Sequence, residues 1–299
     1  MKAGIVAIIG RPNTGKSTLL NRILGEKVAI VSPTAQTTRH QVRGVLHEAR
    51  GQIVFLDTPG LHTKKHAFDR AMVSVIQESM NGADILLHLV DATERVGEEE
   101  EMLLERLAAA SAPVVLGLNK VDRSTTHLGD YIKAWEKRLG RPLAEAGRVT
   151  PVPLSALKGT NVDGLLAACF DLLPEGPPLY PEDVLTDLPR QLTVQEIVRE
   201  KFLAILKEEI PFSMAVFAEE IIDRRPDLAV VKVAVLVERA SQKAIVIGRR
   251  GELLKRVGTA ARKELEEIYG KKFFLEMVVK VSPKWKQDHD LLRRIGYIV

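Results

Sequence analysis

Cysteine is nearly absent from this chain, which has a single one, Cys169, among its 299 residues. A disulfide framework or a cysteine-rich metal site within one chain is therefore excluded, and a reducing compartment fits. No apolar run approaches the roughly 18 residues that span a bilayer. The opening MKAGIVAIIG lacks a small-residue cleavage site after its apolar segment and is interpreted as a first strand. We therefore expect a cytoplasmic protein.

A strong excess of charge is also missing overall, because the formal net charge is only +4. Its distribution is uneven. From Arg239 to Val299 there are 15 Lys and Arg against 7 Asp and Glu, a net of +8, so the preceding part carries −4. A basic segment beside an acidic remainder favours a polyanionic partner for the C-terminal part. The alternative is an ordinary solvated surface.

The first half of the chain alternates short apolar runs with helix-like stretches from Ile5 to about Leu173. Continuous apolar runs suit strands buried on both faces, and the intervening segments supply crossover helices. We expect a doubly wound α/β domain over 1–174, with a mostly parallel sheet that binds ligands at the carboxyl ends of its strands. The apolar runs are IVAIIG, IVFLDTPG, ILLHLVDA, VVLGLNKVD and VTPVPLSAL.

Proline and acidic residues are dense in LPEGPPLYPEDVLTDLPR, so a linker is predicted over 175–189. The pattern then changes to that of a small α+β domain over 190–299. We expect a helix over 192–209 and a strand pair, SMAVFAEEII and LAVVKVAVLVE, around DRRPD. A helix over 252–269, the strand FFLEMVVKV and a basic tail with a short helix follow.

The segment GRPNTGKS matches a P-loop and stands between a predicted strand and a predicted helix. In such a loop the backbone N–H groups cradle phosphates, Lys16 reaches the β and γ oxygens, and the Ser17 hydroxyl binds Mg²⁺. The residues predicted to contact the nucleotide here are Gly10, Arg11, Pro12, Asn13, Thr14, Gly15, Lys16, Ser17 and Thr18.

Three further motifs, DTPG, NKVD and SAL, follow in order at the ends of later apolar runs. Asp57 would face the metal, and the Gly60 N–H would meet the γ-phosphate. Asp122 can accept from the ring N–H and amino group of guanine, a donor pair that adenine lacks, and Ala156 can donate its N–H to the guanine carbonyl. The sequence therefore predicts a GTP and GDP site with Mg²⁺. Its members are Asp57, Thr58, Pro59, Gly60, Asn119, Lys120, Asp122, Ser155, Ala156 and Leu157.

The stretch IVIGRRGELL holds a Gly-x-x-Gly turn between an apolar segment and a helix, which is typical of a KH domain clamping about four nucleotides of single-stranded RNA. A plain tight turn is the alternative. Trp285 is read either as a core residue or as a base-stacking one. The residues predicted to contact RNA are Ile245, Val246, Ile247, Gly248, Arg249, Arg250, Gly251, Leu254, Lys255 and Arg256.

Residues 1 to about 175, with GRPNTGKS, DTPG, NKVD and SAL, resemble the Era branch of the translation-factor-like GTPases. The segments PFS, VIGRRGELLKRVGTAARKELE, VKVSPKW and LLRRIGY resemble that family's type II KH domain. The resemblance implies a bacterial GTPase that binds the 3′ end of 16S ribosomal RNA and assists assembly of the 30S subunit. We expect a monomer, with slow hydrolysis because Leu61 has no group that orients water.

A second role discussed for relatives is a signalling GTPase on the inner face of the cell membrane, whose basic tail binds anionic lipid. The tail of this chain has neither a long apolar face nor a lipidation motif, and this favours RNA.

The resemblance also suggests how GTP is hydrolysed. Thr38 maps onto the switch threonine that joins the Mg²⁺ shell, with Thr37 as the adjacent alternative. Leu61 stands where Ras-like proteins carry the water-orienting glutamine, and an aliphatic chain cannot orient water. Asn13 resembles an asparagine that helps hold K⁺ near the phosphates; a hydrogen bond within the loop is its other reading. The predicted catalytic residues are Asn13, Lys16, Thr38 and Gly60, with His62, His66 and Arg39 as further helpers.

Overall fold

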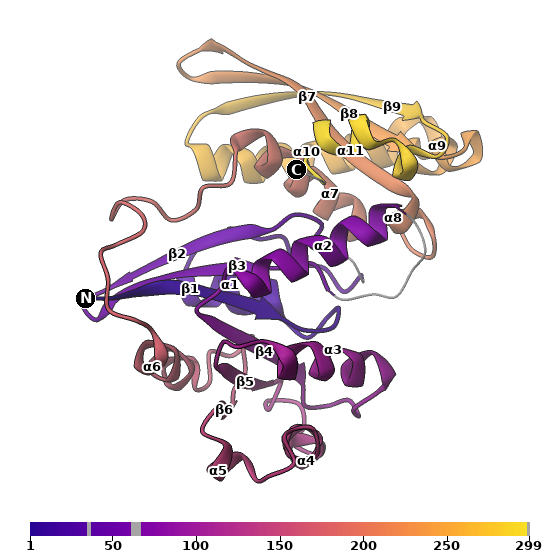
Figure 1. Ribbon diagram of the computed structural model, residues 1–299. Coiled ribbons are helices and arrows are strands. Elements are labelled where there is room, and N and C mark those ends of the chain that lie inside the picture. Colours follow the sequence, from indigo (N-terminus) through magenta and orange to yellow (C-terminus); the bar gives the residue numbers. More distant parts are fainter. Residues whose placement is uncertain (35–36, 61–66, 298–299) are drawn as a thin grey trace. The chain divides into compact units, whose positions relative to one another are not determined.

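The computed structural model describes residues 1–34, 37–60 and 67–297, and the chain forms two compact units. Figure 1 shows the course of each unit. The first unit comprises Met1–Val31, Thr38–Lys65 and Asp69–Asp187; the second comprises Ser32–Thr37, His66–Phe68 and Leu188–Val299. The last boundary falls inside the segment predicted as a linker.

A six-stranded sheet of order β2-β3-β1-β4-β5-β6 forms the centre of the first unit. Strand β2 runs antiparallel to β3, and the other neighbouring pairs are parallel. Every residue of β3, β4 and β5 is buried, which explains their continuous apolar runs. The strands are β1 (Lys2–Ile9), β2 (Val42–Glu48), β3 (Gly51–Asp57), β4 (Ile85–Asp91), β5 (Val114–Asn119) and β6 (Val149–Pro153).

Helices cover both faces of this sheet and create two apolar cores. Ile8 of β1 packs in one core with side chains of α1 and α6. Its neighbour Ile9 points to the opposite face and packs in a second core with α2, α3 and α4. The helices are α1 (Lys16–Leu24), α2 (Ala67–Asn81), α3 (Glu98–Ala109), α4 (Leu128–Leu139), α5 (Leu143–Ala146) and α6 (Val162–Leu172). This arrangement confirms the predicted doubly wound α/β domain.

The proline-rich segment after α6 lies against strands β2 and β3 of the first unit. The N–H of Val45 in β2 donates to the carbonyl of Leu185 at 2.8 Å. The side-chain oxygen of Gln52 accepts the N–H groups of Leu179 and Tyr180 at 2.6 and 3.0 Å. Residues 175–187 are therefore part of a folded unit, which the composition of the segment did not predict.

The second unit is a three-stranded sheet of order β7-β8-β9 with helices on one face. Strands β7 and β8 are antiparallel, whereas β8 and β9 are parallel. The strands are β7 (Met214–Arg225), β8 (Leu228–Val237) and β9 (Lys272–Val281), and the helices are α7 (Arg190–Leu203), α8 (Ile210–Ser213), α9 (Ala240–Ile247), α10 (Glu252–Tyr269) and α11 (His289–Arg294). The small α+β domain predicted here is confirmed.

Two local features of this unit differ from the sequence analysis or decide between its alternatives. The apolar residues before the Gly-x-x-Gly turn form the last turn of helix α9, which was not predicted. The Gln242 side chain starts that helix by accepting the N–H groups of Glu238 and Arg239. Trp285 is fully buried and its indole N–H donates to the Ser213 carbonyl at 3.0 Å, so the core reading is correct and base stacking is wrong.

Candidate nucleotide and RNA sites

The P-loop joins the end of β1 to the start of α1, as predicted. Gly15 immediately before α1 has φ 102°, and a Cβ there would lie 2.4 Å from the side-chain nitrogen of Asn119. Only glycine meets both conditions without strain. The free N–H groups at the start of α1 and the positive end of its dipole then face the loop, which is a ready site for phosphates.

Lys16 is buried inside this loop with only 6% of its surface exposed. Its Nζ donates to the carbonyls of Gly10 and Arg11 at 3.0 and 2.8 Å. Burial lowers the pKa of Lys16 to about 8, although the carboxylates of Asp57 and Glu100 act in the opposite direction. A partly desolvated ammonium group held this way gains a strong partner when an anionic phosphate arrives.

This pKa gives nucleotide binding a defined pH dependence. Below the pKa of about 8, Lys16 is charged in the free and bound protein alike, so the affinity is flat. Above it, the free protein loses a proton that the phosphate-bound form keeps, because anionic oxygens raise the pKa. GDP affinity should therefore fall about tenfold by about pH 9. Calorimetry in buffers of different ionisation enthalpy should detect uptake of a proton. Lys16→Arg, charged throughout, should show a flat profile, and a flat wild-type profile would contradict the role of Lys16.

Three side-chain oxygens that could bind a metal ion meet beside the P-loop. Ser17 Oγ donates to Asp57 Oδ2 at 2.6 Å, and Thr38 Oγ1 lies 3.3 Å from the same oxygen and 3.0 Å from Ser17 Oγ. The hydroxyl of Thr37 instead donates to the Thr34 carbonyl. Within the described part of the chain, the fully buried Asp57 Oδ1 has no hydrogen-bond partner. Hard oxygen donors with one unsatisfied carboxylate oxygen fit Mg²⁺.

The electrostatics of Asp57 also fit a divalent cation beside it. Burial raises the pKa of this carboxyl, and Lys16 with the hydroxyls of Ser17 and Thr38 only partly offsets the effect. A divalent ion would remove the cost of the buried charge. Of the two threonines that the sequence left open, the geometry supports Thr38.

The base-recognition motif follows the end of β5. Asn119 Nδ2 donates to the Thr14 carbonyl at 2.7 Å, which ties this motif to the P-loop. Asp122 is exposed, and its carboxylate makes no hydrogen bond to another described residue. The Ala156 N–H, assigned above to the guanine carbonyl, donates to Asn119 Oδ1 at 2.9 Å. To contact the base, the Ala156 N–H would therefore have to share or break its hydrogen bond with Asn119.

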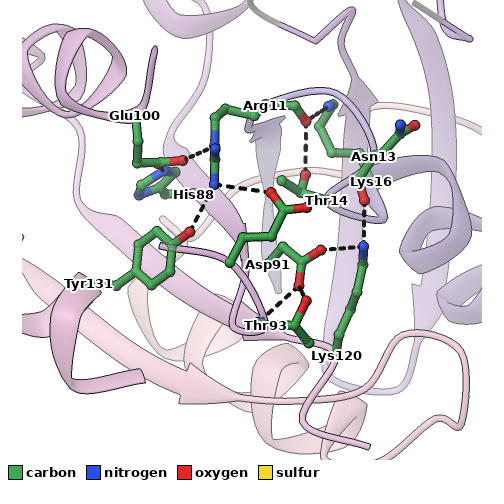
Figure 2. A network of polar contacts seen from close by, with 11 residues as sticks. Arg11, Asn13, Thr14, Lys16, His88, Asp91, Thr93, Glu100, Lys120 and Tyr131 are labelled. Atoms are coloured by element: carbon green, nitrogen blue, oxygen red, sulfur yellow. Dashed lines mark hydrogen bonds and ion pairs between the residues drawn. The ribbon is translucent and has the colours of Figure 1, made fainter. Parts of the chain in front are cut away.

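Lys120 bridges the base motif and the phosphate loop (Figure 2). Its Nζ donates to the Asn13 carbonyl at 2.7 Å and pairs with Asp91 at the end of β4. The pKa of Asp91 lies below its usual range: burial opposes this, but hydrogen bonds from Lys120 and Thr93 outweigh it. Asp91 was not among the predicted residues. The signal was its position at the end of an apolar run, directly comparable to Asp57.

The side chain of Arg11 does not line the phosphate loop. It turns toward α3 and α4, where Nε donates to Glu100 at 2.6 Å and Nη2 donates to the Tyr131 hydroxyl at 2.9 Å (Figure 2). The contact between Arg11 and nucleotide that the sequence predicts therefore stays a prediction for its backbone, which lies in the loop.

The Gly-x-x-Gly turn connects α9 to α10 and presents both arginines to solvent. Gly248 has φ 77° with a virtual Cβ only 2.7 Å from that of Leu253, and Gly251 has φ 81°. Arg250 has φ 52°, a left-handed conformation that is uncommon outside glycine. Arg249 and Arg250 form no ion pair with any acidic side chain in the described ranges.

The surface around the turn is basic and partly apolar. Lys255 and Arg256 at the start of α10 are exposed, and Ile245 is 50% exposed. Val246 is fully buried in the core of the second unit, so its predicted contact with RNA is wrong. In the described ranges no helix has the length and apolarity needed to cross a bilayer.

Some predicted residues lie outside this description. Leu61, His62 and His66 fall outside the described residues. Arg39, predicted as a further helper in hydrolysis, is buried, with 2% of its surface exposed.

Comparisons with known proteins match both units of the chain. Residues 5–120 match the family model "50S ribosome-binding GTPase", and residues 213–286 match the KH domain model. GTPase Era of Geotalea daltonii is 44% identical over 298 residues, covering 99% of this chain and 97% of the relative. Halothermothrix orenii GTPase Era is 38% identical over 99% of this chain and 98% of its own length.

Solved structures agree over the full length. A crystal structure of Era in complex with MgGDPNP and nucleotides 1506–1542 of 16S ribosomal RNA is 41% identical, with a TM-score of 0.93 and 100% of both chains covered. An Aquifex aeolicus Era variant bound to GDP.AlF4⁻ has the same identity, TM-score and coverage. A P-loop GTPase domain followed by a KH domain, matched over nearly its whole length by these relatives, places this chain in the Era family of GTPases.

Proposed function

We propose that this protein binds and hydrolyses GTP and, through its KH domain, binds the 3′ end of 16S ribosomal RNA and assists assembly of the small ribosomal subunit. One observation carries the proposal: a complete set of guanine-nucleotide motifs and an exposed, doubly charged Gly-x-x-Gly turn occur in one chain. The Era structure solved with an RNA of that sequence region supports it. The protein acts as a monomer in the cytoplasm.

The metal that accompanies GTP is Mg²⁺, held by Ser17, Thr38 and Asp57. The relative solved with MgGDPNP and the unsatisfied Asp57 oxygen support this assignment. Bound there, the ion supplies positive charge against the phosphate oxygens. Lys16 adds a second positive charge, and the amides of the P-loop orient the phosphates. Gly60 contributes its N–H on the γ-phosphate side.

Hydrolysis is slow in the absence of a partner, because Leu61 has no group that orients water. We propose that K⁺ bound with the help of Asn13 supplies charge where other GTPases use an arginine finger. Asn13 is exposed at the phosphate loop with φ 63°.

Replacing Na⁺ by K⁺ at constant ionic strength should raise the rate of GTP hydrolysis at least about tenfold. GDP affinity in each salt is measured beside it, so that binding and hydrolysis are separated. Asn13→Gly is the matched variant, because glycine keeps the positive φ and removes only the side chain. It should hydrolyse GTP equally in both salts. Equal rates in the wild type would remove the potassium proposal and leave GTP binding intact.

The proposed RNA site consists of the turn and its flanks. Arg249, Arg250, Lys255 and Arg256 neutralise phosphates, while the apolar surface of Ile245, Ile247 and Leu254 lies against bases. Gly248 and Gly251 allow close approach of the RNA backbone.

A competition experiment tests the function against the membrane alternative. Labelled single-stranded RNA with the sequence of the 3′ end of 16S rRNA is bound to the wild type with a GTP analogue. Unlabelled RNA should displace it, and phosphatidylserine vesicles should not. Displacement by vesicles at matched phosphate concentration would instead favour a peripheral membrane role. RNA affinity is then measured with a GTP analogue, with GDP and without nucleotide. By linkage, the factor by which GTP raises RNA affinity must equal the factor by which RNA raises GTP affinity.

A further inference from the structure

A continuous chain of hydrogen-bonded polar side chains runs from helix α4 to the P-loop, and Figure 2 shows its members His88, Glu100 and Arg11. The indole N–H of Trp135 in α4 donates to His88 Nδ1 at 3.1 Å. His88 Nε2 in β4 and Glu100 Oε1 in α3 lie 2.6 Å apart, and Arg11 Nε donates to Glu100 Oε2 at 2.6 Å. His88, Glu100 and Trp135 are fully buried.

The chain has a defined direction, because an indole can only donate. His88 Nδ1 must therefore accept, so the imidazole carries its proton on Nε2 and donates it to Glu100. Each oxygen of Glu100 then has one donor. Burial alone would raise the pKa of Glu100, but His88 and the charge of Arg11 outweigh it and hold the pKa below its usual range. The carboxylate stays ionised and paired only while both donors remain in place.

The other end of this chain is the backbone of the phosphate loop. The Arg11 carbonyl accepts Lys16 Nζ at 2.8 Å and Thr14 Oγ1 at 3.1 Å. The guanidinium that α3 holds and the carbonyl that holds Lys16 belong to the same residue. Holding the Arg11 side chain in place therefore restricts the position of the Arg11 carbonyl.

We infer that Trp135, His88, Glu100 and Arg11 form a positioning network that keeps the P-loop in its phosphate-binding conformation before nucleotide arrives. The inference rests on the proposed binding of GTP at this loop. If the network is loosened, a smaller fraction of the protein has a P-loop that can bind phosphates. The apparent dissociation constant for the nucleotide then rises by the inverse of that fraction.

The network holds the loop that binds the phosphates of both nucleotides, and none of its hydrogen bonds involves Asp122, the residue assigned to the guanine donors. Loss of the network should therefore lower the affinities for GDP and GTP by similar factors. The preference for guanine over other bases should stay unchanged. Loss of a metal ligand or of the base contact would not give that pattern. These two ratios distinguish the network from a metal ligand and from a base contact.

The test is Glu100→Gln, which keeps the shape of the side chain and removes its charge. GDP affinity should fall by about tenfold to a hundredfold, the effect of a lost charge-assisted hydrogen bond. Arg11→Lys keeps a positive charge near Glu100 but loses the planar guanidinium, whose Nε and Nη2 donate separately to Glu100 and Tyr131. It should therefore weaken GDP binding in the same range. Tyr131→Phe removes one hydroxyl from Arg11 and should have a smaller effect.

Leu107 supplies the matched control. It lies on the same helix as Glu100 and is fully buried, but its side chain is apolar and packs in the core. Leu107→Ala, or Leu107→Val if that better matches the melting temperature of Glu100→Gln, should leave GDP affinity unchanged. If Glu100→Gln and Arg11→Lys bind GDP within twofold of the wild type, the network is only structural and the inference is overturned. Failure of the wild type itself to bind GDP would instead reject the proposed function.

Discussion

Asp122→Asn is expected to lower GTP affinity about a thousandfold and to raise affinity for xanthosine triphosphate, because two charge-assisted hydrogen bonds to the guanine donors are lost together. The amide that replaces the carboxylate places its own N–H donor against the ring N–H and the amino group of guanine, which are also donors. In xanthine a carbonyl replaces the amino group, so the same amide finds an acceptor. The exposed Asp122 carboxylate, which has no partner in the described ranges, has no structural role to lose.

Calorimetric titration of both nucleotides against both proteins measures this change. Asp163→Asn is a suitable control because it removes the same charge from an exposed position at the start of α6. It should bind GTP as the wild type does. Unchanged guanine preference in Asp122→Asn would contradict the assignment of NKVD.

Changing Arg249 and Arg250 together to aspartate should lower affinity for single-stranded RNA by at least about a hundredfold, because two phosphate contacts become two repulsions. The turn itself should survive, since aspartate is among the residues that tolerate the left-handed conformation of Arg250. GTP affinity should not change, because the nucleotide motifs belong to the first unit. Fluorescence anisotropy with labelled RNA and calorimetry with GTP measure the two affinities.

The control for this variant is a second arginine pair in the same domain. Arg224 and Arg225 are also adjacent and exposed, at the end of β7, and their replacement by aspartate changes the net charge equally. That variant should lose much less affinity for RNA. The salt dependence gives an independent check: the slope of log affinity against log salt should fall by about 1.4 when two phosphate contacts are lost. Equal losses in both variants would mean that the turn contributes only general charge.

Much of the nucleotide site could be predicted because each motif is contiguous and sits at the end of a buried strand. Parallel pairing places Ile8 beside Asp57 and Asp91 beside Asn119, so motifs far apart in sequence meet at one edge of the sheet. Apolar runs without alternation were enough to identify those strands. The basic turn was recognisable for a similar reason, since its glycines and arginines are consecutive.

Features that depend on distant partners could not be predicted in this way. Nothing in GRPNTGKS indicates that Arg11 would pair with Glu100, which lies 89 positions further along the chain. The burial of Val246 depends on α9, a helix of eight residues whose start is fixed by a side chain rather than by a strong periodic pattern. Prolines and acids predicted a linker over 175–189, a part of the chain that has neither helix nor strand. Its hydrogen bonds to Val45 and Gln52 are tertiary.

Those bonds have a consequence for the solubility of the first unit. Strand β2 is the last strand of its sheet, and an open edge of this kind is a template for pairing with another chain. The Leu185 carbonyl caps that edge at Val45, and the Val184 carbonyl lies 3.0 Å from the ring nitrogen of His47 two positions further on. A fragment that stopped at residue 174 would uncover this edge and invite aggregation. The separated domain has to extend to Asp187 to keep its own protection against self-association.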